Sequence, residues 1–266
     1  MTLQIPEAFN TAFGLGAPQA YYPVKNGNRV GNLVAGIIFL GVAVILFLYG
    51  LYDTYTAYMR HGPATIDEHL IAPLLISAVL FFLGLLGGWA AYNNWNKGVV
   101  VYGNGFAARD RKGVRTWLWT DVISYSAAVT RHYTNGIYTG TTHIYTIYNK
   151  QNERLVFADL YKNVEQLGQA IEAASFPMRY ENARQLYNTG QPVIFGPVAI
   201  SKAGIVIGKK TYPWAEVKQV SIHQGVLKVS KKDGGWFSGA SATAPSIPNL
   251  RVLLSIIDQV VGVKAG

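Results

Sequence analysis

Two long apolar runs near the start of the chain, residues 30–52 and 70–92, dominate its hydrophobic pattern. Neither run contains a Lys, Arg, Asp, Glu or His residue. A helix rises about 1.5 Å per residue, so each run would reach roughly 35 Å and cross a hydrocarbon core of about 30 Å. Because backbone groups in lipid need internal partners, we predict two transmembrane helices rather than a buried soluble hairpin or a cleaved signal peptide.

The residues around these runs predict an orientation. Aromatic residues that are typical of membrane interfaces gather at the ends of the runs: Tyr21, Tyr22, Tyr49, Tyr52, Tyr55, Tyr58, Trp89, Tyr92 and Trp95. Residues 53–69 carry more acidic than basic side chains, whereas Lys and Arg precede the first run and follow the second. The positive-inside rule then predicts a plasma-membrane protein with two spans, a cytoplasmic N-terminal tail at residues 1–29 and a cytoplasmic C-terminus.

After the second run the pattern changes to strands. Residues rich in β-branched and aromatic side chains predict strands at 98–102, 106–109, 116–119, 122–131, 137–148 and 155–158. Asn135-Gly136 is a strong signal for a two-residue hairpin turn between two of them. Apolar residues then recur at helical spacing over residues 164–174, after the candidate N-cap Asn163.

This pattern of strands and one helix occurs a second time. Trp119, Asp121 and Val122 align with Trp214, Glu216 and Val217, followed by strands at 217–223 and 226–230 and a helix from Leu250 to Val260. We therefore predict one domain at residues 93–175 and a second at 195–266. The polar residues 176–194, which contain Pro177 and Gly190, are the predicted linker.

The repeated pattern of strand, glycine turn, strand and an aromatic-x-acid-Val step (WTDV, WAEV) resembles the bacterial pleckstrin-homology-like domain. Two membrane spans followed by such domains are similar to uncharacterised bacterial membrane proteins of that group. The resemblance implies an α+β fold, in which a two-helix transmembrane hairpin precedes two tandem pleckstrin-homology-like β-barrels or sandwiches, each closed by a C-terminal helix. It also implies a non-catalytic binding module.

The composition limits the kinds of functional site that the chain can contain. The chain has 266 residues, a formal net charge of +9 and no cysteine, which excludes disulfides, thiolate zinc sites and cysteine nucleophiles. We find no nucleic-acid-binding motif and attribute the basic excess to an anionic membrane leaflet.

Two glycine-containing segments resemble nucleotide-binding loops but lack the helix that must follow such a loop: Gly103-Asn104-Gly105 and Gly208-Lys209-Lys210. The five histidines lack metal-ligand spacing, although His132 and His143 could face each other across the hairpin. We predict no catalytic residue, metal or cofactor.

Three features are candidate sites. The first is a basic turn, which either only marks topology or binds lipid headgroups or phosphate: Arg109, Arg111, Lys112 and Arg115. The second either contacts the membrane interface or is a disordered loop: Lys228, Lys231, Lys232 and Trp236. The third, Gly84 and Gly88, allows close helix packing within the hairpin or with a second copy.

These features predict a membrane-anchored, non-enzymatic binding or scaffold protein. Its expected partners are anionic lipids and either a second protein or a second copy of itself within a larger complex. The alternative is a component of a membrane enzyme or transporter whose site the sequence does not reveal. The absence of ionisable residues from both runs argues against a proton or ion pathway.

Overall fold

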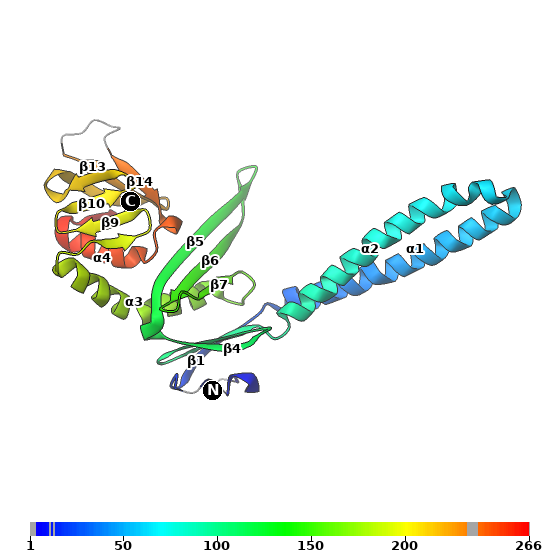
Figure 1. Cartoon of the computed structure of the whole chain (residues 1–266), viewed down its shortest axis with the longest axis horizontal. Coiled ribbons are helices and arrows are strands. Elements are labelled where there is room, and N and C mark those ends of the chain that lie inside the picture. Colours follow the sequence, from blue (N-terminus) through cyan, green and yellow to red (C-terminus); the bar gives the residue numbers. More distant parts are fainter. Residues whose placement is uncertain (1–3, 11, 13, 233–238, 266) are drawn as a thin grey trace. The chain divides into compact units, whose positions relative to one another are not determined.

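The computed structural model describes residues 4–10, 12, 14–232 and 239–265. It confirms an α+β chain in which two long apolar helices are followed by antiparallel sheets (Figure 1). The chain divides into two compact units. The hairpin unit comprises residues 23–99 and 108–114, and the strand-rich unit comprises residues 1–22, 100–107 and 115–266.

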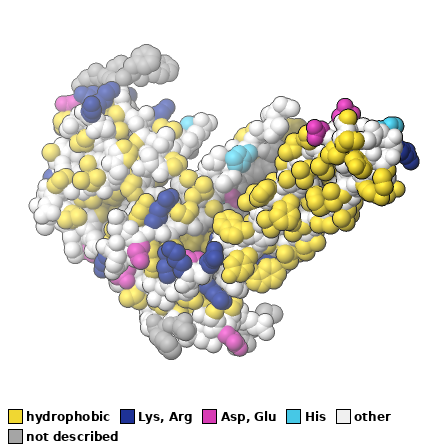
Figure 2. Space-filling model, turned by 45° about the vertical axis from the view of Figure 1, so that its right-hand side comes forward, with side chains coloured by type: hydrophobic (Ala, Val, Ile, Leu, Met, Phe, Trp, Pro, Cys, Tyr) yellow, Lys and Arg dark blue, Asp and Glu magenta, His cyan; other side chains and the backbone are white. Residues whose placement is uncertain are grey.

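The hairpin unit is built on α1 (Asn32–His61) and α2 (Ile66–Asn94). Both are long and apolar enough to cross a membrane, with mean hydropathies of 2.7 and 2.5 in their most apolar windows. Only 17% and 11% of those windows are buried, whereas a core helix of a soluble protein is mostly buried. Figure 2 shows hydrophobic side chains covering the hairpin, with charged groups at its far end.

Residues 53–69, which connect the two predicted spans, are mostly helical. The two helices are joined only by Gly62 and the short 3₁₀ helix Pro63–Thr65. His69 Nδ1 on α2 lies 2.7 Å from Asp53 Oδ2 on α1, so a polar contact joins the helices beyond the apolar runs. The helices therefore continue past the predicted spans, because the polar residues there still favour helix and find partners across the hairpin.

Small residues line the interface between α1 and α2. The buried residues are spaced seven apart on both helices: Gly36, Ala43, Gly50 and Ala57 on α1, and Ser77, Gly84 and Ala91 on α2. This spacing is the heptad period of a left-handed helix pair. A Cβ added to Gly36 would lie 3.0 Å from the Gly84 carbonyl oxygen. Gly87 also packs against α1, whereas a Cβ built on Gly88 would meet no atom of α1 within 4 Å.

The first half of the strand region contains two sheets and a helix. A four-stranded sheet has the order β1 (Pro18–Pro23), β2 (Gly98–Tyr102), β3 (Gly105–Asp110) and β4 (Gly113–Leu118). A three-stranded antiparallel sheet follows, with the order β5 (Val122–Thr134), β6 (Ile137–Asn149) and β7 (Arg154–Ala158). α3 (Val164–Asn188) comes next.

The second half follows the same order of elements. Its four-stranded sheet consists of β8 (Val193–Phe195), β9 (Val198–Ser201), β10 (Gly204–Ile207) and β11 (Lys210–Pro213). Its second sheet contains β12 (Val217–His223), β13 (Val226–Lys231) and β14 (Ala240–Thr243), with β15 (Val263–Ala265) added parallel to β12. α4 (Leu250–Val261) packs its buried face into this half.

The two halves also share local geometry. Trp119 and Trp214 each begin a 3₁₀ turn that leads into β5 or β12. The indole N–H of Trp119 donates to Gly103 O at 3.0 Å, and that of Trp214 donates to Ser201 O at 2.8 Å. Each tryptophan is thereby held by the preceding sheet at the point where the chain passes to the next sheet.

The N-terminal residues form part of the first half, which corrects the expectation of a tail at residues 1–29. The amide of Asn104 donates to Leu15 O at 2.8 Å, and Phe9 and Leu15 are buried. β1 lies beside β2 in the sheet although both apolar helices separate them in sequence. The hairpin is thus an insertion between the first two strands, where the second half has only Gly196-Pro197 between β8 and β9.

The predicted linker is also corrected, since α3 runs without a break through Pro177 to Asn188. Before the proline, Leu167 and Ile171 are buried; after it, Ala183 and Tyr187 join the core of the second half. An internal proline removes one helix hydrogen bond. Burial on both sides offsets that loss, so a single helix serves both halves.

A polar junction on α3 joins the two halves. Arg179, only 4% exposed, donates from Nη1 to Asn249 Oδ1 at 2.6 Å and from Nη2 to Ser175 Oγ at 3.1 Å. Its guanidinium lies 5.3 Å from the centroid of the Tyr125 ring, and burial lowers the pKa of Arg179 from its ordinary value to about 10. Asn249 in turn bonds the edge of β5, exchanging main-chain and side-chain hydrogen bonds with Tyr125 and Ile123.

Candidate anion-binding site beside the second apolar helix

The end of α2 and the β3–β4 turn enclose a small pocket within the hairpin unit. Its volume is about 140 Å³, the scale of a phosphate-sized group, and we call it the basic pocket. Its lining comes from the end of α2 and the residues just after it (Tyr92, Asn93, Asn96, Lys97) and from the turn (Arg109, Asp110, Arg111, Gly113).

Local contacts orient the cations of the basic pocket. The Arg111 guanidinium lies 5.4 Å from the centroid of the Tyr92 ring, within cation–π range. Lys97 Nζ donates to Asn94 Oδ1 at 2.9 Å, and the Lys97 carbonyl accepts from Arg29 Nη2 at 3.0 Å. The Lys112 amide donates to Asp110 Oδ1 at 2.8 Å, which closes the turn.

The charge of the basic pocket favours an anion. Three cations, Lys97, Arg109 and Arg111, face a single carboxylate, Asp110, one oxygen of which is already bound by the turn. Guanidinium groups bind carboxylate and phosphate oxygens through paired hydrogen bonds. Tyr92 and Trp95 are exposed near the end of α2, and exposed aromatic side chains at the end of an apolar helix are typical of membrane interfaces. The arrangement of charges therefore suits an anionic group such as a phosphate.

The structure divides the four residues of the predicted basic turn. Arg109 and Arg111 line the basic pocket, whereas Lys112 is exposed at the tip of the turn and Arg115 is half-buried on β4, outside the lining. Sequence reasoning treated Lys97 as a flanking charge only and did not single out Asn93 or Asn96. The available signal for these three residues was their position close to Tyr92, at the aromatic end of the second run.

A family model matches residues 6–264 of this sequence. The chain belongs to the DUF6585 family. This is a family of unknown function, and no curated protein matches the sequence. Because the DUF6585 match extends over nearly the whole chain, it includes the inserted hairpin, the basic pocket and both halves of the strand region.

Three of the four residues of the second predicted set lie on β13 of this DUF6585 chain or just after it. Lys231 Nζ lies 2.8 Å from Glu216 Oε2, and this hydrogen bond raises the pKa of Lys231 above its ordinary value. Lys228 is exposed on β13 and Lys232 is exposed just after it. Trp236 lies outside the described residues.

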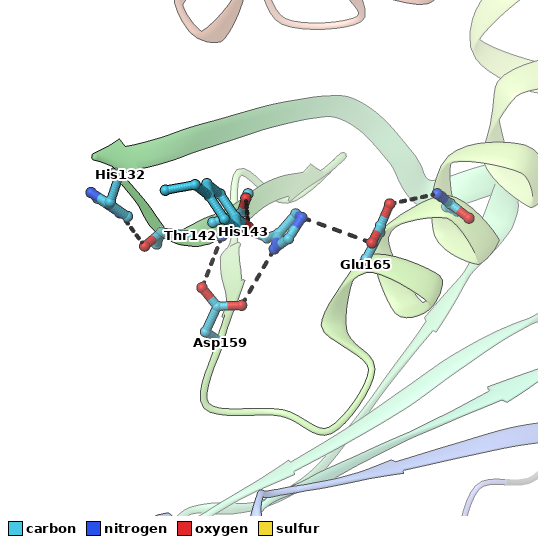
Figure 3. A network of polar contacts seen from close by, with 8 residues as sticks. His132, Thr142, His143, Asp159 and Glu165 are labelled. Atoms are coloured by element: carbon cyan, nitrogen blue, oxygen red, sulfur yellow. Dashed lines mark hydrogen bonds and ion pairs between the residues drawn. The ribbon is translucent and has the colours of Figure 1, made fainter. Parts of the chain in front are cut away.

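His132 and His143 contact hydroxyl and carboxylate oxygens rather than each other (Figure 3). His132 contacts Thr142 Oγ1 at 2.7 Å and does not face His143. His143 lies between two carboxylates, with Nδ1 at 3.4 Å from Asp159 and Nε2 at 3.9 Å from Glu165. Among the described residues, no group of three or more His, Asp or Glu side chains has the geometry of a metal site.

Proposed function

We propose that this chain is a membrane-anchored, non-enzymatic binding protein whose basic pocket takes an anionic phosphate group at the membrane surface. The observation that carries the proposal is the cluster of Lys97, Arg109 and Arg111 beside the end of a helix apolar enough to span a bilayer. An anionic leaflet attracts basic residues beside a span by about 1 kcal/mol each, which supports this assignment.

We further propose that the two halves are tandem pleckstrin-homology-like domains and that the hairpin is inserted into the first. Support comes from the shared order of four strands, three strands and a helix, and from the matched tryptophan turns. Gly105 and Gly204 occupy corresponding places, since a Cβ on either would collide with the backbone oxygen of Trp117 or Tyr212. A non-catalytic role agrees with this assignment.

Anion binding can be tested on the full chain in neutral detergent. We expect short-chain phosphatidylglycerol to raise the thermal midpoint by several degrees and phosphatidylcholine to leave it unchanged. Arg109→Gln together with Arg111→Gln should abolish the shift, because both guanidinium groups line the basic pocket. The matched control is Lys209→Gln with Lys210→Gln, which removes two cations from the β10–β11 turn in the second half and should retain the shift.

Two further arms of this experiment separate the sources of the anion. A shift with inorganic phosphate alone would assign the basic pocket to a free anion, whereas a shift with the lipid alone would assign it to a headgroup. Added salt should weaken either shift. Equal responses of the arginine and lysine variants would contradict the proposed site.

The proposed orientation, with both termini in the cytoplasm, has its own test because the chain contains no cysteine. We expect Ala64→Cys, between the two helices, to react with a membrane-impermeant maleimide in intact cells. Ile194→Cys, exposed on β8, should react only after the cells are opened. The reverse labelling pattern would invert the orientation.

A further inference from the structure

The β5–β6 hairpin is much longer than its sheet requires. Each strand has 13 residues, but β7 pairs with β6 only from Ile144 inward, where Ile144 is opposite Ala158. Residues 129–143 therefore form a two-stranded ribbon that projects beyond β7 (Figure 1). We call this ribbon the arm.

The tip of the arm is apolar on both faces. Tyr133 and Tyr138 are opposite each other in register, with ring centroids 5.9 Å apart, and are 59% and 56% exposed. Ile137 is 70% exposed, and because neighbouring side chains on a strand point to opposite faces, it lies on the other face. Asn135 and Gly136, both at positive φ, form the tight turn between them.

The arm adds nothing to the core of its half. No residue from 129 to 143 is buried, and the pairing is supported by surface contacts such as His132 Nε2 to Thr142 Oγ1 at 2.7 Å across the two strands. An isolated two-stranded ribbon is only marginally stable in water, and large exposed apolar side chains do not favour one. A ribbon that presents such side chains at its end is therefore better explained by a surface that it meets.

The charge of the arm indicates which kind of surface its tip contacts. Residues 122–149 contain no Asp or Glu, and Arg131 stands just before the tip. Tyrosine places its ring among lipid headgroups and keeps its hydroxyl wet, while isoleucine enters the acyl boundary. The two apolar helices tether the chain to a bilayer, so this surface is present at high effective concentration.

We propose that the tip of the arm enters the headgroup region of the membrane that holds the two helices. This gives the strand-rich unit a second, peripheral contact with anionic lipid, separate from the basic pocket. Tyr133, Ile137 and Tyr138 supply the apolar contact, and Arg131 supplies the attraction to anionic lipid.

The absence of native cysteines allows a direct test in the full chain. A polarity-sensitive fluorophore is attached to Ile137→Cys, and the protein is reconstituted in nanodiscs of phosphatidylglycerol and phosphatidylcholine. We expect a blue-shifted emission and about twofold quenching by a lipid with a shallow spin label. The matched control is Ile194→Cys on β8, where the native side chain is 72% exposed and the probe should remain unquenched.

Three outcomes decide the proposal. Quenching at position 137 that falls when Tyr133→Ser and Tyr138→Ser are added, or when Arg131→Gln is added in anionic nanodiscs, supports it. Equal, weak quenching at positions 137 and 194 overturns it. A blue shift without quenching by the spin-labelled lipid also overturns it, because the tip is then covered by protein.

Discussion

Replacing Asn249 with alanine is expected to lower the free energy of unfolding of the strand-rich unit by about 2–4 kcal/mol. Its side-chain oxygen accepts from the Tyr125 amide at 2.9 Å and from Arg179 at 2.6 Å, and its side-chain nitrogen donates to Ile123 O at 2.9 Å. Alanine would remove all three bonds and leave a buried guanidinium with fewer acceptors. Alanine also tolerates the φ of +55° poorly.

Asn163 provides the control for backbone conformation. It precedes α3 as Asn249 precedes α4, with a φ of +54°, and its side chain makes no capping hydrogen bond. Asn163→Ala should cost only about 1 kcal/mol, the part due to the left-handed backbone. Urea unfolding of the full chain in detergent, followed by tryptophan fluorescence, measures both variants. Equal losses would mean that the Arg179 junction does not hold the halves together.

Leucine at Gly36 is expected to force α1 and α2 apart and to lower hairpin stability by about 3 kcal/mol. A Cβ at this position already lies 3.0 Å from both the Gly84 carbonyl oxygen and the Gly88 amide nitrogen. These are backbone atoms inside a helix pair, so no side chain can move aside to make room. The midpoint of unfolding by sodium dodecyl sulfate, followed by helical circular dichroism, should fall accordingly.

Gly41→Leu is the matched control, because it adds the same bulk to the same helix. A Cβ on Gly41 would meet no described atom of α2 within 4 Å. The control should unfold at the native midpoint. If both variants were equally stable, the seven-residue spacing of small residues would not be what holds the hairpin together.

Elements defined by local chemistry were predictable from the sequence. The Asn135-Gly136 turn requires only two residues that tolerate positive φ between two β-branched runs, and β5 and β6 pair across it as predicted. The apolar helices were equally clear, because their composition excludes most other structures. Their extension beyond the apolar runs was missed, since the polar contact of Asp53 with His69 forms only after the hairpin has closed.

Elements defined by distant partners were not predictable. β1 contains two prolines and two tyrosines expected at a membrane interface, and only its place beside β2 identifies it as a strand. Pro177 indicated a break, but burial of α3 in both halves keeps the helix intact. The basic pocket was predictable only in part. Arg109 and Arg111 form a cluster in the sequence, whereas Tyr92 and Asn96 come next to them only when the chain folds.

The place of the hairpin in the fold sets an order of events during synthesis. β1 leaves the ribosome before either apolar helix, yet its neighbour β2 is made only after both helices. At about 5–20 residues per second, the new strand waits several seconds for its partner. Until β2 is made, β1 has no partner on that side and exposes an unpaired strand edge. Completion of the first sheet therefore has to wait for the synthesis of both apolar helices.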